Sequence, residues 1–232
     1  MFTLRSLMCA TTLAVPMFLA AGAAGAAVVA GSSTGTFSNY TSCDGNCRIT
    51  NNGGTVEWGY PTILGFPVGS GSTLSSVNKT WSQQTDINDL VLAELVWTNL
   101  ATSDSATPDD FNVVYTLKIK FTQPNASEDT EGFDLKITNT KNSAGDTIGG
   151  LNLADLSNLN FTLNGVQVSD IKYKLVSGAG STFNNNIWYN PENRTSTMQI
   201  TADFKAVPEP ASLGLLAAGL FGIGVMRRRK NA

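Results

Sequence analysis

The sequence predicts an all-β protein, either an antiparallel β-sandwich or a jelly roll. Apolar and polar residues alternate with a period of two in several segments, as in strands that have one buried and one solvent-facing side. The stretches between these segments are rich in Gly, Ser, Asn, Thr and Asp, and no long stretch repeats its apolar residues every 3.6 positions. Only the two chain ends depart from this pattern. There we expect a cleaved N-terminal signal helix and a single C-terminal apolar helix.

Residues 1–26 have the features of a secretory signal peptide. The single charge, Arg5, precedes an uncharged apolar run, and Ala24-Gly25-Ala26 fits the small-x-small cleavage pattern. The apolar run continues to Ala30, so an uncleaved membrane anchor is an alternative. A lipoprotein signal is a second alternative, but Cys9 lies inside the apolar run and is expected to be discarded with the signal peptide.

The composition of residues 27–206, which we expect to form one β domain, limits the functions of that domain. This part carries 10 Lys and Arg and 17 Asp and Glu, a net charge of −7. The surplus of negative charge argues against nucleic acid and anionic membranes as partners. The whole chain contains no His. His-based catalytic triads, His-ligated metals and the usual general base near neutral pH are therefore excluded.

Cys43 and Cys47 are the cysteines that remain once the signal peptide is removed. In an oxidising compartment such an even pair is typical of a disulfide, here around the turn-forming triplet Asp44-Gly45-Asn46. A redox-active or metal-binding pair is the alternative. We expect the disulfide to fix a local turn and to add modest stability, since short loops gain least from closure.

Three segments in the middle of the chain are predicted to be strands. Residues 113–121 and 133–137 alternate large apolar residues with polar ones, which indicates half-buried strands. Asp89 to Asn99 is more apolar and predicts a buried central strand, with a short helix as the alternative.

The second half of the domain contains a hairpin signal. Asn164-Gly165 separates the apolar segments 161–163 and 166–168, which predicts a tight β-hairpin. The alternation continues in 171–175, and 198–204 is predicted to be the last strand. The stretches richest in turn residues are expected to be loops, as at 140–150 and 177–187.

The C-terminal tail has three parts in a fixed order: a motif at 207–212, an uncharged apolar segment at 211–226 and a basic cluster at 227–230. As a helix, the 16 apolar residues would be about 24 Å long against a bilayer core of about 30 Å, which predicts a transient span of the inner membrane. The basic cluster would hold the tail end in the cytoplasm. A short buried amphipathic helix is the alternative. The motif consists of Val207, Pro208, Glu209, Pro210, Ala211 and Ser212, and the cluster consists of Arg227, Arg228, Arg229 and Lys230.

This tripartite tail resembles the PEP-CTERM sorting signal of exported bacterial proteins. The resemblance rests on Pro208-Glu209-Pro210, the apolar segment and the terminal Arg cluster. It implies a Gram-negative bacterium that makes exopolysaccharide. It also implies recognition of the tail by an exosortase, a membrane-embedded processing enzyme, followed by release or attachment at the cell surface.

The domain itself resembles, over about residues 35–205, the exported bacterial β-domains known as choice-of-anchor K, which share features with the THxN family of PEP-CTERM proteins. The residues that carry this resemblance are Glu57-Trp58-Gly59-Tyr60-Pro61 and Leu95-Val96-Trp97-Thr98-Asn99. The family typically has Thr-His-x-Asn in the second segment, of which only Asn99 matches here. The family implies no known enzymatic activity.

Acidic side chains are candidates for two kinds of chemistry. Paired carboxylates could hydrolyse glycosidic bonds, but the glutamates stand in no recognisable motif and are expected to be solvated surface acids. Carboxylates gathered in loops suit Ca²⁺, and no other cofactor is expected. The candidate glutamates are Glu57, Glu94, Glu128, Glu131 and Glu192. The calcium candidates are Asp104, Asp109 and Asp110 in one predicted loop, and Glu128, Asp129 and Glu131 crowd another.

Trp188 and Tyr189 are the candidates for contact with a glycan. They lie in the turn-like stretch Trp188-Tyr189-Asn190-Pro191, where a flat aromatic ring could stack on a sugar. Trp97 lies in the most apolar strand and is expected in the core.

The leading hypothesis is a non-enzymatic exported protein of the cell surface or of a biofilm or floc matrix, sorted through its tail. A carbohydrate-binding module for exopolysaccharide is the alternative. A glycoside hydrolase is the second alternative.

Overall fold

The computed structural model describes residues 27–41, 43, 47–60, 62–63, 66–67, 69–101, 110–140 and 144–207. All of these belong to one compact unit, Ala26–Val207. The predicted signal peptide, the apolar segment at 211–226 and the basic cluster at 227–230 lie outside the described residues. Within the described ranges, no helix is both long enough and apolar enough to cross a membrane.

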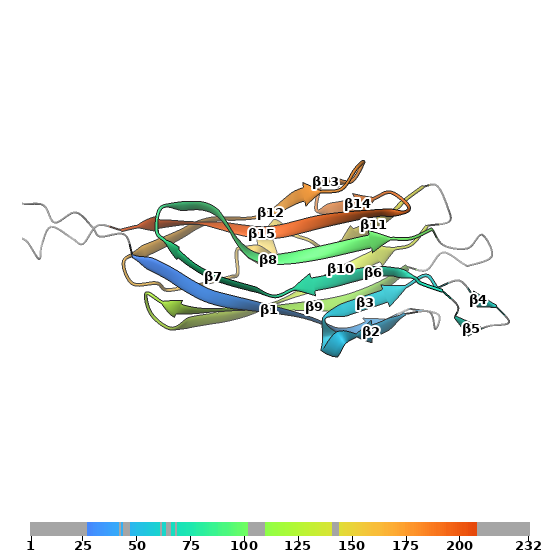
Figure 1. The fold of residues 1–232 in the computed structure, drawn as a ribbon, viewed down its shortest axis with the longest axis horizontal. Coiled ribbons are helices and arrows are strands. Elements are labelled where there is room, and N and C mark those ends of the chain that lie inside the picture. The colour runs from blue at the N-terminus through green and yellow to red at the C-terminus, as the bar shows by residue number, and fades with distance from the viewer. Residues whose placement is uncertain are drawn as a thin grey trace, which may run out of the picture. The chain divides into compact units, whose positions relative to one another are not determined.

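Two antiparallel sheets form the domain, which confirms the predicted all-β sandwich (Figure 1). The first sheet runs in the order β13 (Thr182–Asn184), β14 (Ile187–Asn190), β11 (Asp146–Gly149), β10 (Ser127–Thr138), β9 (Asp110–Gln123), β1 (Val28–Thr41) and β7 (Lys79–Gln84). The second runs in the order β12 (Val166–Ser177), β15 (Arg194–Ala206), β8 (Ile87–Asn99), β6 (Ser72–Val77), β3 (Thr55–Trp58) and β2 (Arg48–Thr50).

The remaining elements are short. β4 (Thr62–Ile63) and β5 (Phe66–Pro67) pair with each other. The 3-10 helix η1 (Asn51–Gly53) joins β2 to β3, and the single α-helical turn α1 (Leu153–Leu156) follows β11.

The period-two alternation of β9 and β10 builds one wall of the core. In β9 every second residue from Phe111 to Phe121 is buried, and the residues between them are exposed or half-buried. β10 continues the wall with Phe133, Leu135 and Ile137. Because each strand buries one face only, the polar residues of the alternation remain on the solvent side.

β8 supplies the opposite wall, and the expectation of a buried central strand is confirmed. It lies between β15 and β6 in the second sheet. Trp97 of β8 is fully buried between Trp58 and Trp188, with ring centroids 6.4 Å and 5.2 Å away. These three indoles link the two sheets at one end of the sandwich, since Trp188 comes from β14 of the first sheet.

The N-terminal strand β1 shows little apolar alternation and was not predicted. Its inward face carries Val29 and Phe37 in the core, and between them lie buried Ser33 and Gly35 and half-buried Gly31. A Cβ atom on Gly31 would lie 2.9 Å from the Trp81 ring, and one on Gly35 would lie 2.3 Å from the Tyr115 hydroxyl. The neighbouring aromatic rings fill the space that side chains at Gly31 and Gly35 would otherwise occupy, so the middle of this strand contributes backbone rather than apolar side chains.

Part of the predicted hairpin at 161–168 is wrong. Leu163 and Val166 form an isolated bridge around Asn164-Gly165, but 161–162 form no strand. Phe161 instead packs its ring against Phe121 in the core, with centroids 4.9 Å apart. The strand after the turn is longer than predicted, because β12 runs on to Ser177 along β15.

The two predicted loops each contain a strand. β11 lies within 140–150 and pairs with β10 and β14, and β13 lies within 177–187 and pairs with β14. These strands are only four and three residues long. A segment this short shows almost no periodicity, and here the hydrogen bonds to a neighbouring strand decide the conformation.

Candidate functional site

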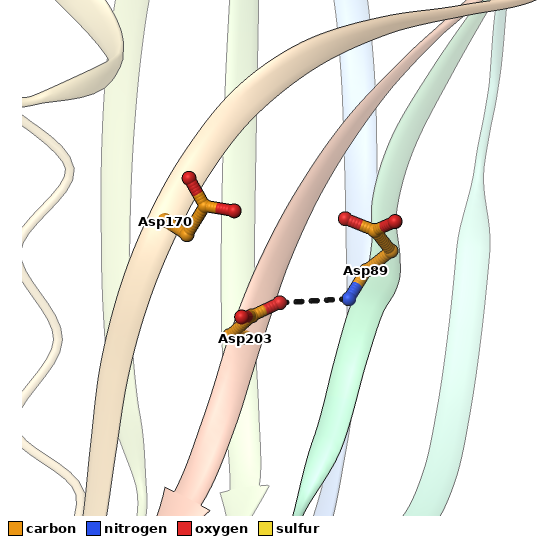
Figure 2. Close-up of side chains that lie close together, drawn as sticks. All are labelled: Asp89, Asp170 and Asp203. Atoms are coloured by element: carbon orange, nitrogen blue, oxygen red, sulfur yellow. Dashed lines mark hydrogen bonds between the residues drawn. The ribbon is translucent and has the colours of Figure 1, made fainter.

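Three aspartates from three adjacent strands gather on the second sheet: Asp89 of β8, Asp203 of β15 and Asp170 of β12 (Figure 2). One carboxylate oxygen from each lies within 4.8 Å of the others. The regular pairing of β12 with β15 is interrupted between Ser169 and Lys172, and that of β15 with β8 between Ala202 and Phe204. The aspartates therefore lie at aligned irregularities, where a bulge re-aims side chains.

The backbone explains why aspartate fits two of these positions. Asp89 has a φ of 53° and Asp170 a φ of 51°, both in the left-handed region that Asp and Asn enter more readily than most residues. Asp203 stabilises the irregularity through its side chain, since its Oδ1 accepts a hydrogen bond from the backbone N–H of Asp89 at 2.9 Å.

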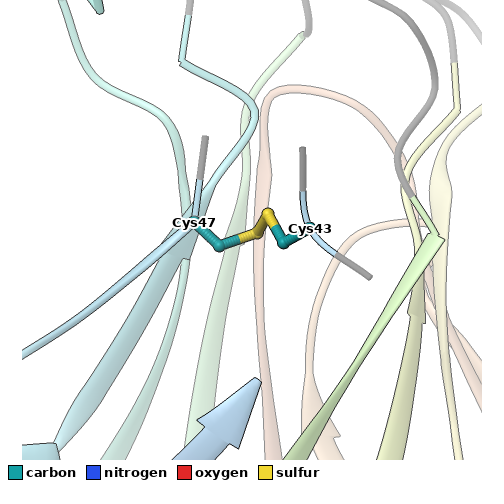
Figure 3. The surroundings of a disulfide bond; sticks show 2 residues. All are labelled: Cys43 and Cys47. Carbon is teal, nitrogen blue, oxygen red and sulfur yellow. A yellow bond between two sulfur atoms is a disulfide. The ribbon is translucent and has the colours of Figure 1, made fainter. Parts of the chain in front are cut away.

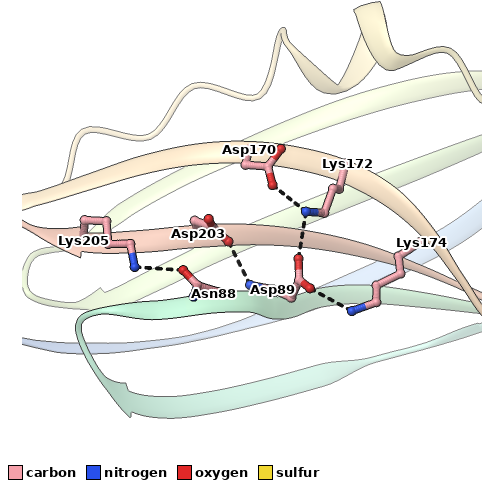
Figure 4. Close-up of polar contacts among 7 residues, drawn as sticks. All are labelled: Asn88, Asp89, Asp170, Lys172, Lys174, Asp203 and Lys205. Carbon is pink, nitrogen blue, oxygen red and sulfur yellow. Dashed lines mark hydrogen bonds and ion pairs between the residues drawn. The ribbon is translucent and has the colours of Figure 1, made fainter.

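Two lysines pair with this cluster and offset two of its three negative charges (Figure 4). Lys172 lies 2.9 Å from Asp89 Oδ1 and also pairs with Asp170, and Lys174 donates to Asp89 Oδ2 at 2.7 Å. The hydrogen bonds from Lys174 and then Lys172 hold the pKa of Asp89 near 2. The hydrogen bond to Asp170, followed by that to Asp89, raises the pKa of Lys172.

This arrangement is an exposed ion-pair network rather than an open set of metal ligands. A cation would have to displace an ammonium group that already occupies the space between the carboxylates. Exposed pairs of this kind stabilise a fold by only about 0.2–1 kcal/mol each. Sequence reasoning missed the cluster because its three members lie on three strands and share no local motif.

Two further acidic side chains, Asp146 and Glu192, have carboxylates that are shielded from solvent. Asp146 of β11 is completely inaccessible, and its Oδ1 accepts from the amide of Thr140 at 2.7 Å and from the Thr140 hydroxyl at 3.2 Å. Its Oδ2 has no hydrogen-bond partner, and neither has either carboxylate oxygen of Glu192, although none of these atoms reaches solvent. An ionised carboxylate is costly in such a place.

The pKa values of this pair follow from that burial. Desolvation raises the pKa of Asp146 to about 6, against smaller lowering contributions from Thr140 and from the nearby Trp58 indole. Desolvation, and then the negative charge of Asp146, raises the pKa of Glu192 to about 7. The pKa values of both carboxyl groups therefore lie closer to neutral pH than those of solvated acids. Sequence reasoning missed these two residues because one begins a short strand, the other follows a strand end, and they share no local motif.

A polar hollow of about 580 Å³ lies between β1, η1, β3 and β6. Only Ser, Thr, Asn and Gly residues line it, so it carries no charged side chain. Its wall includes hydrogen bonds from the Asn51 amide to the Thr55 hydroxyl at 3.0 Å and between Thr55 and Ser75 at 3.1 Å. Thr36 and Asn52 remain exposed at its surface.

The predicted disulfide is confirmed (Figure 3). Cys43 and Cys47 are bonded, with their Cα atoms 6.0 Å apart. Cys47 belongs to the buried core, and Cys43 packs partly against it. The bond thereby ties the chain after β1 to the start of β2 at residue 48.

The prediction that Trp188 is an exposed glycan contact is wrong. Residues 187–190 form strand β14 rather than a turn, and Trp188 is completely buried against Trp97. Its neighbour Tyr189 points to the other face, as alternation requires, and donates its hydroxyl hydrogen to the Ala144 carbonyl at 3.0 Å.

The calcium candidates do not form one described group. Asp104 and Asp109 lie outside the described residues, and Asp110 begins β9 as an exposed residue 3.9 Å from the Lys136 ammonium. Residues 128–131, predicted as a loop, belong to strand β10, where Glu128 pairs with Lys118 at 3.2 Å and Asp129 accepts from the Asn160 amide at 2.8 Å. On this strand Glu128 points to the face opposite to that of Asp129 and Glu131, so the three carboxylates do not converge on one ion.

Two of the candidate glutamates, Glu57 and Glu94, are held by neighbouring side chains. The Glu57 carboxylate accepts hydrogen bonds from Arg48 at 2.7 Å and from Thr50 at 2.8 Å, and it also accepts one from the Tyr60 hydroxyl. Glu94 pairs with Lys79 at 3.1 Å and accepts from Gln199 at 2.8 Å.

The two segments that resemble choice-of-anchor K domains come together in the core. Trp58 contacts Trp97, and Asn99 is fully buried. The Asn99 amide donates to the Asn190 carbonyl at 2.8 Å, and its oxygen accepts from Ser72 at 3.2 Å. In this chain both segments therefore hold the two sheets together, and the family resemblance stays a prediction.

The described part of the chain is thus a disulfide-bonded β-sandwich with an ion-pair network on one face. A comparison with known protein families identifies a motif in the C-terminal tail. Residues 206–230 match the model of the PEP-CTERM protein-sorting motif, so the chain carries a PEP-CTERM sorting domain, the signal for export and sorting to the cell surface by the exosortase system. No curated protein and no solved structure matches the chain.

Proposed function

We propose that this protein is a non-enzymatic component of the cell surface or of the extracellular matrix around it, delivered there through its tail. The observation that carries the proposal is the sorting motif at 206–230, which begins where the folded domain ends. The stable sandwich and its disulfide suit a protein that works outside the cytoplasm.

The pairing of the acidic residues supports a non-catalytic role. Glu57, Glu94 and Glu128 each form an ion pair with a basic side chain, and two lysines form ion pairs in the cluster around Asp89. A glycosidase needs two carboxylates that face each other across a cleft at about 5–10 Å, with one of them free to give up a proton.

The tail is proposed to reside briefly in the inner membrane before processing. Its apolar segment at 211–226 would fall short of the bilayer core by about 6 Å, a mismatch that costs only fractions of a kcal/mol per Å. The basic side chains at 227–230 can extend toward the headgroups and offset part of that cost. The partner in this step is the membrane-embedded exosortase.

Deletion of residues 208–232 tests the sorting role and leaves every described residue in place. We expect the truncated protein to be exported and folded but lost from the cell surface into the medium. A matched control keeps the tail and replaces exposed Thr195 by Val. Unchanged surface labelling of the truncated protein in the native host would refute the proposal.

Binding of a neutral polysaccharide is the second candidate function, and the polar hollow between β1, η1, β3 and β6 favours it. Hydroxyl and amide groups without charge match the hydrogen-bonding groups of an uncharged sugar chain. The exopolysaccharide of the host would be the ligand.

Affinity electrophoresis of the whole protein through gels with the host exopolysaccharide tests this candidate. We expect retardation that Thr36→Val combined with Asn52→Ala weakens at least fivefold and that Thr195→Val leaves unchanged. Equal mobility of the wild type with and without polysaccharide would remove the candidate.

A further inference from the structure

The chain enters the fold at a point fixed by hydrogen bonds. The backbone N–H of Ala27 donates to the Thr85 hydroxyl at 3.0 Å, and the N–H of Thr85 returns a bond to the Ala27 carbonyl at 2.8 Å. Ala27 is thus held against the turn between β7 and β8.

The chain leaves the fold at the same turn. The N–H of Asp86 donates to the Phe204 carbonyl at 2.8 Å, and the Asp86 carboxylate accepts from the N–H of Ala206 at 3.3 Å. One residue further, the N–H of Val207 donates to the Gly165 carbonyl at 2.8 Å. Ala27, Thr85, Asp86, Gly165 and Val207 therefore lie together, and we call this group the terminal face. Figure 1 shows the blue and the red-orange ends of the domain at the same side.

No spacer separates the terminal face from the sorting motif. The match to the family model begins at Ala206, inside β15, and Pro208 follows Val207 directly. Consecutive Cα atoms are 3.8 Å apart, so the Pro-Glu-Pro segment starts within one residue of a hydrogen-bonded position. Val207 is also 45% exposed, which leaves an apolar side chain open at this junction.

We propose that the terminal face is the surface on which the membrane-embedded processing enzyme contacts the folded domain. Because Pro208 follows Val207 directly, an enzyme that binds the Pro-Glu-Pro segment is brought next to the residues around Val207. This inference rests on the proposed sorting function and adds the place of the contact.

The length of β15 separates the two ends of the domain. β15 has 13 residues, so its first residue, Arg194, lies about 40 Å from its last. The end that carries Asn193 and Glu192 is therefore far from the terminal face, and we call it the distal end.

Photo-cross-linking in the native host tests the proposal with the full-length protein. A photoreactive phenylalanine analogue replaces Asn164, next to Gly165 of the terminal face, or Asn193 at the distal end, both exposed turn residues. We expect position 164 to give a cross-link to an integral membrane protein at least tenfold more strongly than position 193. The mass of the chain from the same cells shows whether the tail has been processed.

Two results would overturn the inference alone: processing of the tail without a cross-link at position 164, or equal cross-linking at both positions. A tail that is never processed would overturn the sorting function, and the inference would fall with it.

A flexible spacer distinguishes two explanations for a cross-link at position 164. In the first, the direct connection of Val207 to Pro208 brings the enzyme to the terminal face. In the second, position 164 is merely close to the membrane. A flexible insert of 12 Gly and Ser residues between Val207 and Pro208 adds about 20 Å of reach. We expect it to reduce the cross-link at position 164 more than fivefold while the tail is still processed. The same insert between Asn185 and Asn186, in the turn from β13 to β14, should leave the cross-link unchanged, and an equal effect of both inserts would contradict the proposal.

Discussion

Asp146 makes the stability of the domain depend on pH in a direction opposite to that of most aspartates. Burial raises its pKa in the folded state from 3.8 to about 6. The folded state therefore holds a proton that the unfolded chain releases near pH 4. The stabilisation is complete below that pH and is lost as the pH rises through about 6, a difference of about 3 kcal/mol.

Asp146→Asn should remove this dependence, because Asn keeps the oxygen that accepts from Thr140 and carries no charge. Urea unfolding should show the variant about 1–3 kcal/mol more stable than the wild type at pH 8 and about equal at pH 4. Asp134→Asn, on the exposed side of β10, is the matched control. A variant less stable than the wild type by the same amount at both pH values would contradict this account.

Trp188 is a core residue, so its substitution reports on folding. Trp188→Ala removes an indole that is completely buried against Trp97 and should cost about 3–5 kcal/mol of unfolding free energy. Tyr189→Phe, which loses only the hydrogen bond to Ala144, should cost about 0.5–1.5 kcal/mol. Chemical denaturation of both variants measures the difference, and a Trp188→Ala variant as stable as the wild type would show that the indole is not packed in the core.

At the scale of elements, the turn after β11 depends on a glycine. Gly150 has a φ of 88°, and a Cβ there would lie 2.0 Å from the Asp134 carbonyl oxygen of β10. Gly150→Ala should destabilise the protein by about 2–5 kcal/mol, from the left-handed backbone and from displacement of β10. Gly132→Ala is the control, since a Cβ at that position meets nothing within 4 Å. Thermal unfolding that is unchanged in Gly150→Ala would refute this role.

The strands that could be predicted from the sequence are those that bury large apolar side chains. In β9 and β10 these side chains alternate regularly with polar ones, and β8 is apolar enough to be recognised as a central strand. β1 was missed because the inward positions between Val29 and Phe37 are Gly31, Ser33 and Gly35, and aromatic rings of other strands fill the space beside the two glycines. Burial there is decided by neighbours that lie far away in the chain.

The distance along the chain between interacting residues also explains which parts of the candidate site could be predicted from the sequence. The disulfide and the sorting tail are local signals, complete within 5 and 25 consecutive residues. The aspartate cluster joins positions 89, 170 and 203, and its place depends on the pairing of β8, β15 and β12 at their irregularities. The prediction that Trp188 is exposed was wrong because residues 187–190 form the strand β14, which pairs with β11 and is only four residues long.

At the scale of the whole molecule, the folded domain and the C-terminal tail have separate roles. The sandwich begins at Ala27 and ends at Val207 on one terminal face, and the sorting motif starts there without a spacer. The sorting signal thereby lies at the end of the fold and in the residues that follow it, while the domain itself carries a net charge of −7.

Mass spectrometry of the intact protein isolated from the surface of its native host tests the central claim, that the tail is a processed sorting signal, most directly. The account predicts a chain that begins near Ala27, retains the Cys43–Cys47 disulfide and lacks Arg227 to Lys230, with its C-terminus close to Pro208-Glu209-Pro210. Surface protein that still ends at Ala232 would contradict it.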